Sequence, residues 1–199
     1  MKLDFTPPTD GKVHQYCINC HAETVRQIEK DGRGTFVCDT CGQTSNRSLY
    51  FDNRIYWLDE EGELWHETAA VFVRNADGKF LFFNRTLFPF GLTVAAGHVD
   101  NGETPEVSAV RELQEEVGVQ SKRLRHALDT DIIGDKCSSG ADAHKWHVYV
   151  EAYDGDGNIE VLEEGKDPVW LSLDEAATHE MPVAIRYLLE NHAAAIEGR

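Results

Sequence analysis

The 199-residue sequence predicts an α/β domain preceded by a small metal-stabilised module. Two observations predict the domain: β-rich segments flank the turn at 75–78, and the amphipathic segment 105–117 carries helix start and stop signals. The module is predicted by two Cys-x-x-Cys pairs in the first 50 residues. A chain of this length can hold one ordinary domain and one small module.

The charge and composition exclude several protein classes. A formal net charge of −16 opposes non-specific attraction to nucleic acid or to an anionic membrane. The sequence has no apolar run long enough to span a bilayer and no signal-peptide pattern, so a cytoplasmic protein without a membrane partner is expected. In that compartment, paired cysteines favour a metal site over disulfides.

The paired cysteines are Cys17 with Cys20 and Cys38 with Cys41, separated by 17 residues. This spacing is typical of a structural Zn²⁺ site with four thiolates, and the segment resembles a zinc ribbon. A module of this size buries little surface, so zinc would supply folding free energy of the order of 10 kcal/mol. The alternatives are four unliganded thiols or a redox pair. Balanced charge between residues 12 and 50 favours a structural or interface role over nucleic-acid binding.

The elements of the domain are expected in a regular order. The predicted segments are a hairpin of strands 68–73 and 79–83, a strand 92–96, a helix 105–117, a mobile loop 129–143, a strand 144–153, a helix beginning with a capping box at 172–175, and a last helix 182–195. Cys137 lies in the expected loop and is predicted to be incidental, with nothing nearby to activate it. His144 and His147 fall on opposite strand faces, which predicts packing or substrate contacts, not a metal site.

The helix 105–117 has Thr104 as N-cap, Pro105 in its first turn and Gly118 as terminator. The helical period predicts an apolar stripe on one side, formed by Val107, Val110, Leu113 and Val117. Three carboxylates converge on the opposite side, those of Glu112, Glu115 and Glu116. They repel one another, and clustered oxygen ligands suit Mg²⁺ or Mn²⁺.

Residues 97–119 resemble the Nudix box, G-x5-E-x7-R-E-U-x-E-E-x-G-U, where U is a bulky aliphatic residue. The nine defined positions are occupied by Gly97, Glu103, Arg111, Glu112, Leu113, Glu115, Glu116, Gly118 and Val119. A solvated acidic helix face would explain the carboxylates, but not Gly97, Glu103 or Arg111. The resemblance implies a Nudix-type α/β/α sandwich with a mixed sheet, which hydrolyses the diphosphate of a nucleoside diphosphate derivative with Mg²⁺ or Mn²⁺.

The resemblance also implies roles for individual residues. The metal would be held by the three box glutamates and the carbonyl of Gly97, with Arg111 and Glu103 forming a supporting ion pair. The general base would be Glu112, Glu116 or Glu164. Arg85 would face substrate phosphate at the end of its strand, and Glu164 precedes Trp170 by six residues, as in other Nudix sequences.

The expected organisation has four parts. Residues 1–50 form a zinc ribbon with its lead-in, 51–64 a connector and 65–195 the Nudix domain. The terminal Ile196-Glu-Gly-Arg199 equals a common protease-cleavage linker, so residues 196–199 are either native or an added tail and are left out of the fold prediction.

A zinc ribbon before a Nudix domain is similar to bacterial NADH pyrophosphatase-like members, although the Ser-Gln-Pro-Trp-Pro-Phe-Pro-type signature of that group is absent. The substrate candidates are therefore NADH, ADP-ribose, dinucleotides and similar small nucleotides, and the other expected partner is a second copy in a homodimer. One alternative is a non-enzymatic nucleotide sensor whose ribbon contacts nucleic acid, although such sensors tend to lose box glutamates. Another is isopentenyl-diphosphate isomerase, which needs a cysteine where this chain has Ala95 and Ala96.

Overall fold

The computed structural model describes residues 1–30, 33–52, 55–155, 157–162 and 164–199. The strands of the N-terminal part are β1 (His14–Cys17), β2 (Val25–Lys30), β3 (Arg33–Cys38), β4 (Thr44–Ser45), β5 (Ser48–Phe51) and β6 (Tyr56–Leu58). The remaining strands are β7 (Leu64–Arg74), β8 (Phe80–Arg85), β9 (Gly91–Thr93), β10 (Ala95–His98), β11 (Arg125–Ile133), β12 (Ala143–Ala152) and β13 (Gly165–Leu171). The helices are α1 (Pro105–Val117), α2 (Leu173–Ala176) and α3 (Val183–Glu197).

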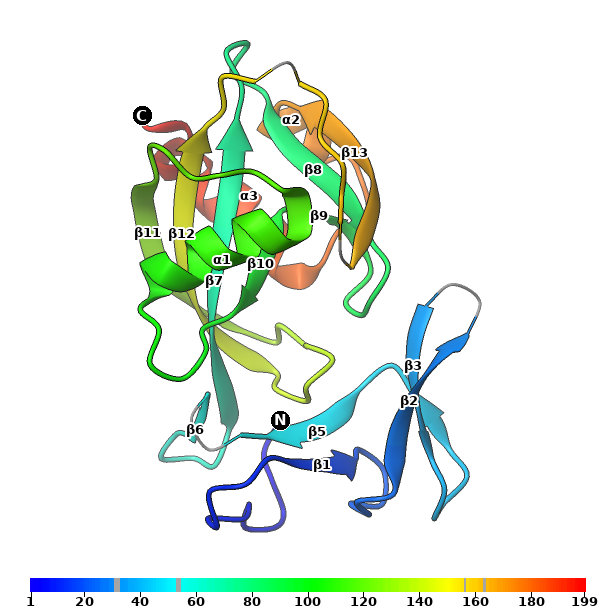
Figure 1. Ribbon diagram of the computed structural model, residues 1–199. Helices are drawn as coiled ribbons and strands as arrows, with labels where there is room; N and C mark the ends of the chain where they lie inside the picture. The colour runs from blue at the N-terminus through cyan, green and yellow to red at the C-terminus, as the bar shows by residue number, and fades with distance from the viewer. Residues whose placement is uncertain (31–32, 53–54, 156, 163) are drawn as a thin grey trace.

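A mixed eight-stranded sheet forms the centre of the domain. Its main path runs β11-β12-β7-β8-β13, with β6 and β10 also paired to β7 and β9 paired to β8. Strand β12 runs parallel to β7, and the other pairs are antiparallel. The predicted hairpin is present as β7 and β8. The long strand β7 is therefore the element on which most of the sheet is assembled (Figure 1).

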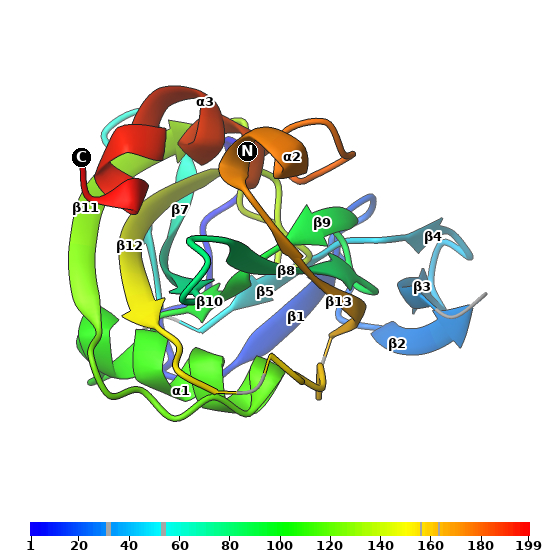
Figure 2. The same cartoon turned by 90° about the horizontal axis from the view of Figure 1, so that it is seen from above.

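Helices cover both faces of this sheet, as the view from above shows (Figure 2). Helix α1 packs on one face through Ala109, Leu113 and Val117, and α3 packs on the other through Ala184, Ile185 and Leu188. The side chains of β7 alternate between the two buried layers, as the period of a strand requires. The predicted α/β/α sandwich with a mixed sheet is confirmed.

Helix α1 has the predicted ends, but only Leu113 and Val117 of its predicted apolar stripe are buried. Thr104 Oγ1 accepts a hydrogen bond from Val107 N at 3.3 Å, and Gly118 takes a left-handed φ of 66°. Val107 and Val110, however, are 53% and 40% exposed, and Glu116 lies on the buried side instead. The helical period predicts that apolar residues share one side of the helix. Which residues are buried depends on where the helix meets the sheet, and here the small residue Ala109 is among the buried ones.

The segment 129–143 was also predicted wrongly as one loop. Strand β11 continues to Ile133 along β12, so the loop is limited to 134–142. The acidic residues of this segment are compatible with a strand because β11 lies at the edge of the sheet, where charged side chains can reach solvent. In the last helix, Ile196 of the tail omitted from the fold prediction is fully buried in the α3 layer.

The N-terminal part contains a three-stranded sheet, β2-β3-β4, and a two-stranded sheet, β1-β5. Strand β6, in the segment expected to be a connector, pairs with β7. Leu49 and Phe51 of β5 pack with Leu64 and Ala141 of the domain, so the two parts share an apolar cluster. Among the described helices, none combines the length and apolar character needed to cross a membrane.

Candidate functional site

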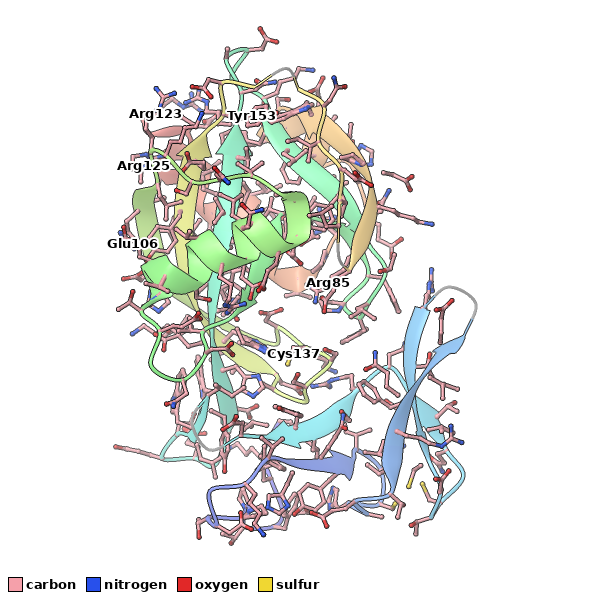
Figure 3. The ribbon with its side chains drawn as sticks, in the orientation of Figure 1. Arg85, Glu106, Arg123, Arg125, Cys137 and Tyr153 are labelled. Atoms are coloured by element: carbon pink, nitrogen blue, oxygen red, sulfur yellow. The ribbon has the colours of Figure 1, made fainter. Side chains whose placement is uncertain are left out.

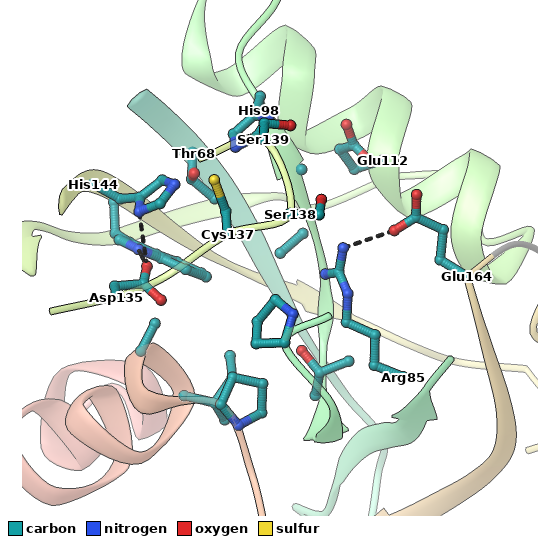
Figure 4. Close-up of a pocket in the computed structure, with 18 of the residues that line it drawn as sticks. Thr68, Arg85, His98, Glu112, Asp135, Cys137, Ser138, Ser139, His144 and Glu164 are labelled. Carbon is teal, nitrogen blue, oxygen red and sulfur yellow. Dashed lines mark hydrogen bonds and ion pairs between the residues drawn. The ribbon is translucent and has the colours of Figure 1, made fainter. Parts of the chain in front are cut away.

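A cavity of about 340 Å³ lies at the end of the sheet where α1 meets β10 (Figure 4). Seven of the predicted site residues line it, namely Arg85, Gly97, Arg111, Glu112, Glu115, Glu116 and Glu164. Glu103 stands behind Arg111. The three box glutamates reach the cavity because α1 presents positions i, i+3 and i+4 to one side.

Arg111 is the centre of an ion-pair network on α1. Its Nε and Nη2 donate to the two oxygens of Glu103, both at 2.9 Å, in a bidentate fork. Nη1 donates to Glu112 at 2.6 Å and to Glu115 at 3.1 Å. The hydrogen bond from Arg111 holds the pKa of Glu103 below its ordinary value. The expected Arg111–Glu103 pair is thus present, and it anchors the loop before α1 to the helix.

The carboxylate of Glu116 is buried between α1 and β10. It is 4% exposed and accepts a hydrogen bond from the N–H of Ala96 at 2.7 Å. Burial raises the pKa of Glu116 to about 8, and burial also raises the pKa of Glu112. Two neighbouring carboxyl groups with raised pKa values would be stabilised as carboxylates by a cation placed between them.

The residues around these carboxylates fit a hard divalent cation. The donors are carboxylate oxygens, which Mg²⁺ and Mn²⁺ prefer. A Cβ on Gly97 would lie 2.0 Å from Glu112 Oε1, so only glycine lets the β10 backbone approach this carboxylate. Gly97 therefore lies directly beside Glu112 in the lining of the cavity.

Arg85 and Glu164 lie beside the box carboxylates, on the same side of the cavity as Glu112 (Figure 4). Arg85 ends β8, and Glu164 stands directly before β13, whose Gly165 pairs with Arg85 in the sheet. This register brings Arg85 Nη2 to 2.7 Å from Glu164 Oε2. Among the described residues, the buried Nε of Arg85 has no hydrogen-bond partner. A guanidinium with a free N–H at a cavity wall suits an anionic group such as phosphate.

The four paired cysteines also converge, in the N-terminal part (Figure 3). The Sγ atoms of Cys17 and Cys41 are 3.8 Å apart, and those of Cys20 and Cys38 are 3.6 Å apart. The edges of a tetrahedral zinc–thiolate site are about 3.8 Å long, from Zn–S bonds near 2.3 Å. The cluster therefore has the dimensions of a zinc-ribbon site.

A second group of ligating side chains contradicts two predictions. Cys137 is not an incidental thiol, because its Sγ lies 3.6 Å from His66 Nδ1, and His66 Nδ1 lies 3.2 Å from His98 Nε2. His144 joins them, so it is more than a packing residue, while His147 on the other face pairs with Glu67 and Asp129. Burial disfavours the Cys137 thiolate, yet hydrogen bonds from His144 and the other imidazoles hold its pKa well below the ordinary range.

Sequence reasoning did not find this group because its members come from four separate segments. His66 lies on β7, His98 on β10 and His144 on β12, with Cys137 in the loop before it. The available signal is the strand register, in which His144 stands directly beside His66 and His98 beside Thr68. The register of two parallel strands cannot be predicted from one sequence unless it is already known that the two strands are neighbours.

Comparisons with known proteins agree with this fold. The NUDIX domain family matches residues 64–191. The chain belongs to the Nudix family. The Gluconobacter oxydans (strain 621H) protein named RNA pyrophosphohydrolase is 33% identical over 126 residues, covering 57% of this chain and 74% of the relative. The Chromobacterium violaceum protein named NAD-capped RNA hydrolase NudC is 29% identical over 184 residues, covering 90% of this chain and 58% of the relative.

Solved structures of Nudix proteins share the fold of the domain. The MutT protein from Methanosarcina mazei Go1 has a TM-score of 0.54 at 18% identity and covers 63% of this chain and 91% of that one. The ORF135 protein of E. coli has a TM-score of 0.53 at 26% identity and covers 68% and 93%. The enzyme class predicted from the box, a Nudix pyrophosphohydrolase, is confirmed.

Proposed function

We propose that the chain hydrolyses the diphosphate linkage of a nucleoside diphosphate derivative in the cavity between α1 and the Arg85–Glu164 pair. The observation that carries this proposal is the pairing of opposite charges in one cavity: carboxylates suited to a divalent cation lie beside a guanidinium suited to phosphate. A diphosphate bound with the cation would contact both the cation and Arg85. Nudix enzymes act on nucleotides of this kind, and the unbroken box supports hydrolysis over mere sensing.

In this proposal, Glu112, Glu115, Glu116 and the Gly97 carbonyl hold Mg²⁺ or Mn²⁺. The bound ion would polarise a phosphoryl oxygen, lower the pKa of a water and orient both. Arg111 positions Glu112 and Glu115 through its hydrogen bonds to both, while Glu103 fixes Arg111. Glu164 is already neutralised by Arg85. The base that accepts the proton of the attacking water is therefore sought among Glu112 and Glu116.

Two observations support a choice of substrate class: a similar protein and the charge of the chain. The relative named NAD-capped RNA hydrolase matches across 90% of this chain, which supports substrates with a dinucleotide diphosphate such as NADH. A net charge of −16 and a module with balanced charge argue against a long RNA as the preferred ligand. We therefore place free dinucleotides and ADP-ribose ahead of capped RNA, with Zn²⁺ in the cysteine cluster as a structural ion.

A substrate panel with Mg²⁺ or Mn²⁺ tests this proposal. It contains NADH, ADP-ribose, dinucleoside polyphosphates, nucleoside triphosphates, sugar nucleotides and a short RNA carrying an NAD cap, with products separated by chromatography. The expected result is a nucleoside monophosphate from one of the free diphosphate derivatives, at a higher kcat/KM than from capped RNA. Tight nucleotide binding without product from any substrate would make the chain a sensor. A higher kcat/KM for capped RNA would reverse the substrate order.

A further inference from the structure

His98, Cys137 and His144 line the active-site cavity (Figure 4), and the fully buried His66 joins them to form a histidine–cysteine group. One ligating atom from each residue falls within 4.8 Å of all the others. In the described part of the chain, only the cysteine cluster of the N-terminal module and this group converge so closely. The carboxylates of the box are not one of these groups.

The sheet itself presents the three imidazoles together. His66 and His144 are direct neighbours on the parallel strands β7 and β12, and His98 pairs with Thr68, two positions along β7. All three therefore project from the same face, the face that α3 covers further along. The loop 134–142 then returns over this end of the sheet and places Cys137 as the fourth member.

Two of the imidazole rings, those of His66 and His144, are buried. His66 is fully buried, its Nδ1 faces His98 and Cys137, and within the described residues its Nε2 has no hydrogen-bond partner. His144 is 2% exposed, and its Nδ1 lies at the ion-pair distance of 3.2 Å from Asp135 Oδ2, without hydrogen-bond geometry. Trp146 Nε1 donates to the same Asp135 oxygen at 2.8 Å and fixes it. A carboxylate behind a histidine is the outer contact that metal-ligating imidazoles commonly make.

We propose that His66, His98, Cys137 and His144 bind a second Zn²⁺, distinct from the cysteine-cluster ion and from the catalytic Mg²⁺ or Mn²⁺. Three imidazoles and one thiolate are ligands that zinc accepts in tetrahedral geometry. With Zn–N near 2.1 Å and Zn–S near 2.3 Å, the tetrahedron has edges of about 3.4–3.6 Å. The 3.2 Å and 3.6 Å separations found here match that size. One thiolate and three neutral imidazoles leave a net charge of +1.

Four protein ligands fill the coordination sphere, which assigns the ion a structural role. It fastens the loop 134–142, whose Ser138 and Ser139 line the cavity, to the sheet. It also fixes His98, whose carbonyl accepts hydrogen bonds from Arg111 Nη2 at 3.1 Å and Ser108 Oγ at 3.2 Å. The second zinc would thus tie the outer wall of the cavity to the first residues of the Nudix box.

Elemental analysis of the full chain tests this inference independently of any hydrolysis. Protein purified under reducing conditions is exchanged into Mg²⁺ buffer, which occupies the oxygen site, and its zinc is counted. We expect two zinc ions per chain, and one in Cys137→Ser. His147→Ala is the matched control, because His147 is a buried imidazole on the opposite face of the same strand, and it should keep two.

Cobalt substitution gives a second measurement that does not depend on the variant keeping its full stability. The five cysteines would provide five Co–S bonds, so Cys137→Ser should lose about one fifth of the sulfur-to-cobalt charge-transfer absorbance. One zinc per wild-type chain, or a zinc count and cobalt spectrum unchanged by Cys137→Ser, would overturn the second site and leave a hydrogen-bonded cluster. Neither result depends on whether the protein hydrolyses a nucleotide.

Discussion

The cysteine cluster and the histidine–cysteine group each bring four ligating atoms within 4.8 Å, but the chain builds them differently. Cys17, Cys20, Cys38 and Cys41 come from two tight turns of one small module. The members of the other group come from β7, β10, β12 and a loop, and they meet only after the sheet has formed. The local site can organise its own folding, whereas the assembled site depends on a fold that already exists.

This difference predicts the largest effect for a change in the local site. Cys38→Ser should release the cysteine-cluster zinc and unfold the N-terminal module, because the metal supplies folding free energy of the order of 10 kcal/mol there. Hydrogen exchange should show lost protection in β2 and β3 while α1 stays protected. Asn19→Ala, inside the first cysteine turn but bonded to Cys17 only through its backbone N–H, is the control. Retained zinc and protection in Cys38→Ser would mean that the module folds without the metal.

The second effect concerns the Nudix box. Its residues are close in sequence, but strand β10 of the sheet also contacts its carboxylates. Glu116→Gln should fold normally, because an amide oxygen can still accept from Ala96 N–H, yet lose about 10²-fold or more in kcat, roughly 2.7 kcal/mol. Glu112→Gln should behave in the same way. Rates are measured at saturating metal, so weaker metal affinity does not imitate lost catalysis.

Glu106→Gln is the matched control for these variants. Glu106 is exposed in the first turn of the same helix and lies outside the cluster, so its rate should stay near wild type. Wild-type turnover in Glu116→Gln and Glu112→Gln would remove the catalytic role of α1.

The same contrast explains what could be predicted from the sequence. The ends of α1 depend on Thr104 and Gly118 alone, so local chemistry predicted them. The burial of Glu116 and the exposure of Val110 depend on where β10 lies, which no helical period contains. His66 and His144 are neighbours only through the parallel pairing of β7 with β12. The cysteine pairs and the box were readable because their members are close in sequence.

The next effect concerns Arg47, which joins the N-terminal part to the loop that carries Cys137. Its Nε donates to Cys137 O at 2.9 Å, and its Nη2 donates to Gly140 O at 2.9 Å and Ala141 O at 3.0 Å, beside an ion pair with Asp142. Arg47→Ala should lower the free energy of unfolding by about 2 kcal/mol, since hydrogen bonds made by a charged group are the stronger kind.

Urea unfolding and limited proteolysis of the loop 134–142 measure this change. Arg26→Ala is the comparison, because its ion pair with Asp39 is largely exposed and should contribute under about 0.5 kcal/mol. Equal stability and equal cleavage of the loop in the two variants would show that Arg47 does not hold the loop.

The smallest effect is a pH dependence of stability that comes from the Arg111–Glu103 ion pair. This pair joins two parts of the Nudix box without a bound metal ion. The hydrogen bond from Arg111 lowers the pKa of Glu103 from its ordinary value of 4.5, so the folded state favours the carboxylate. Its stabilisation is therefore complete above that value and is lost as the pH falls through the lowered folded pKa. Glu103→Gln should cost about 1–2 kcal/mol at neutral pH and progressively less in acid. Urea titrations from about pH 7 to pH 3 measure both proteins, and Glu106→Gln should show no such convergence. A cost that stays constant across this range would show that the charge of Glu103 does not stabilise the loop before α1, and that shape alone positions Arg111.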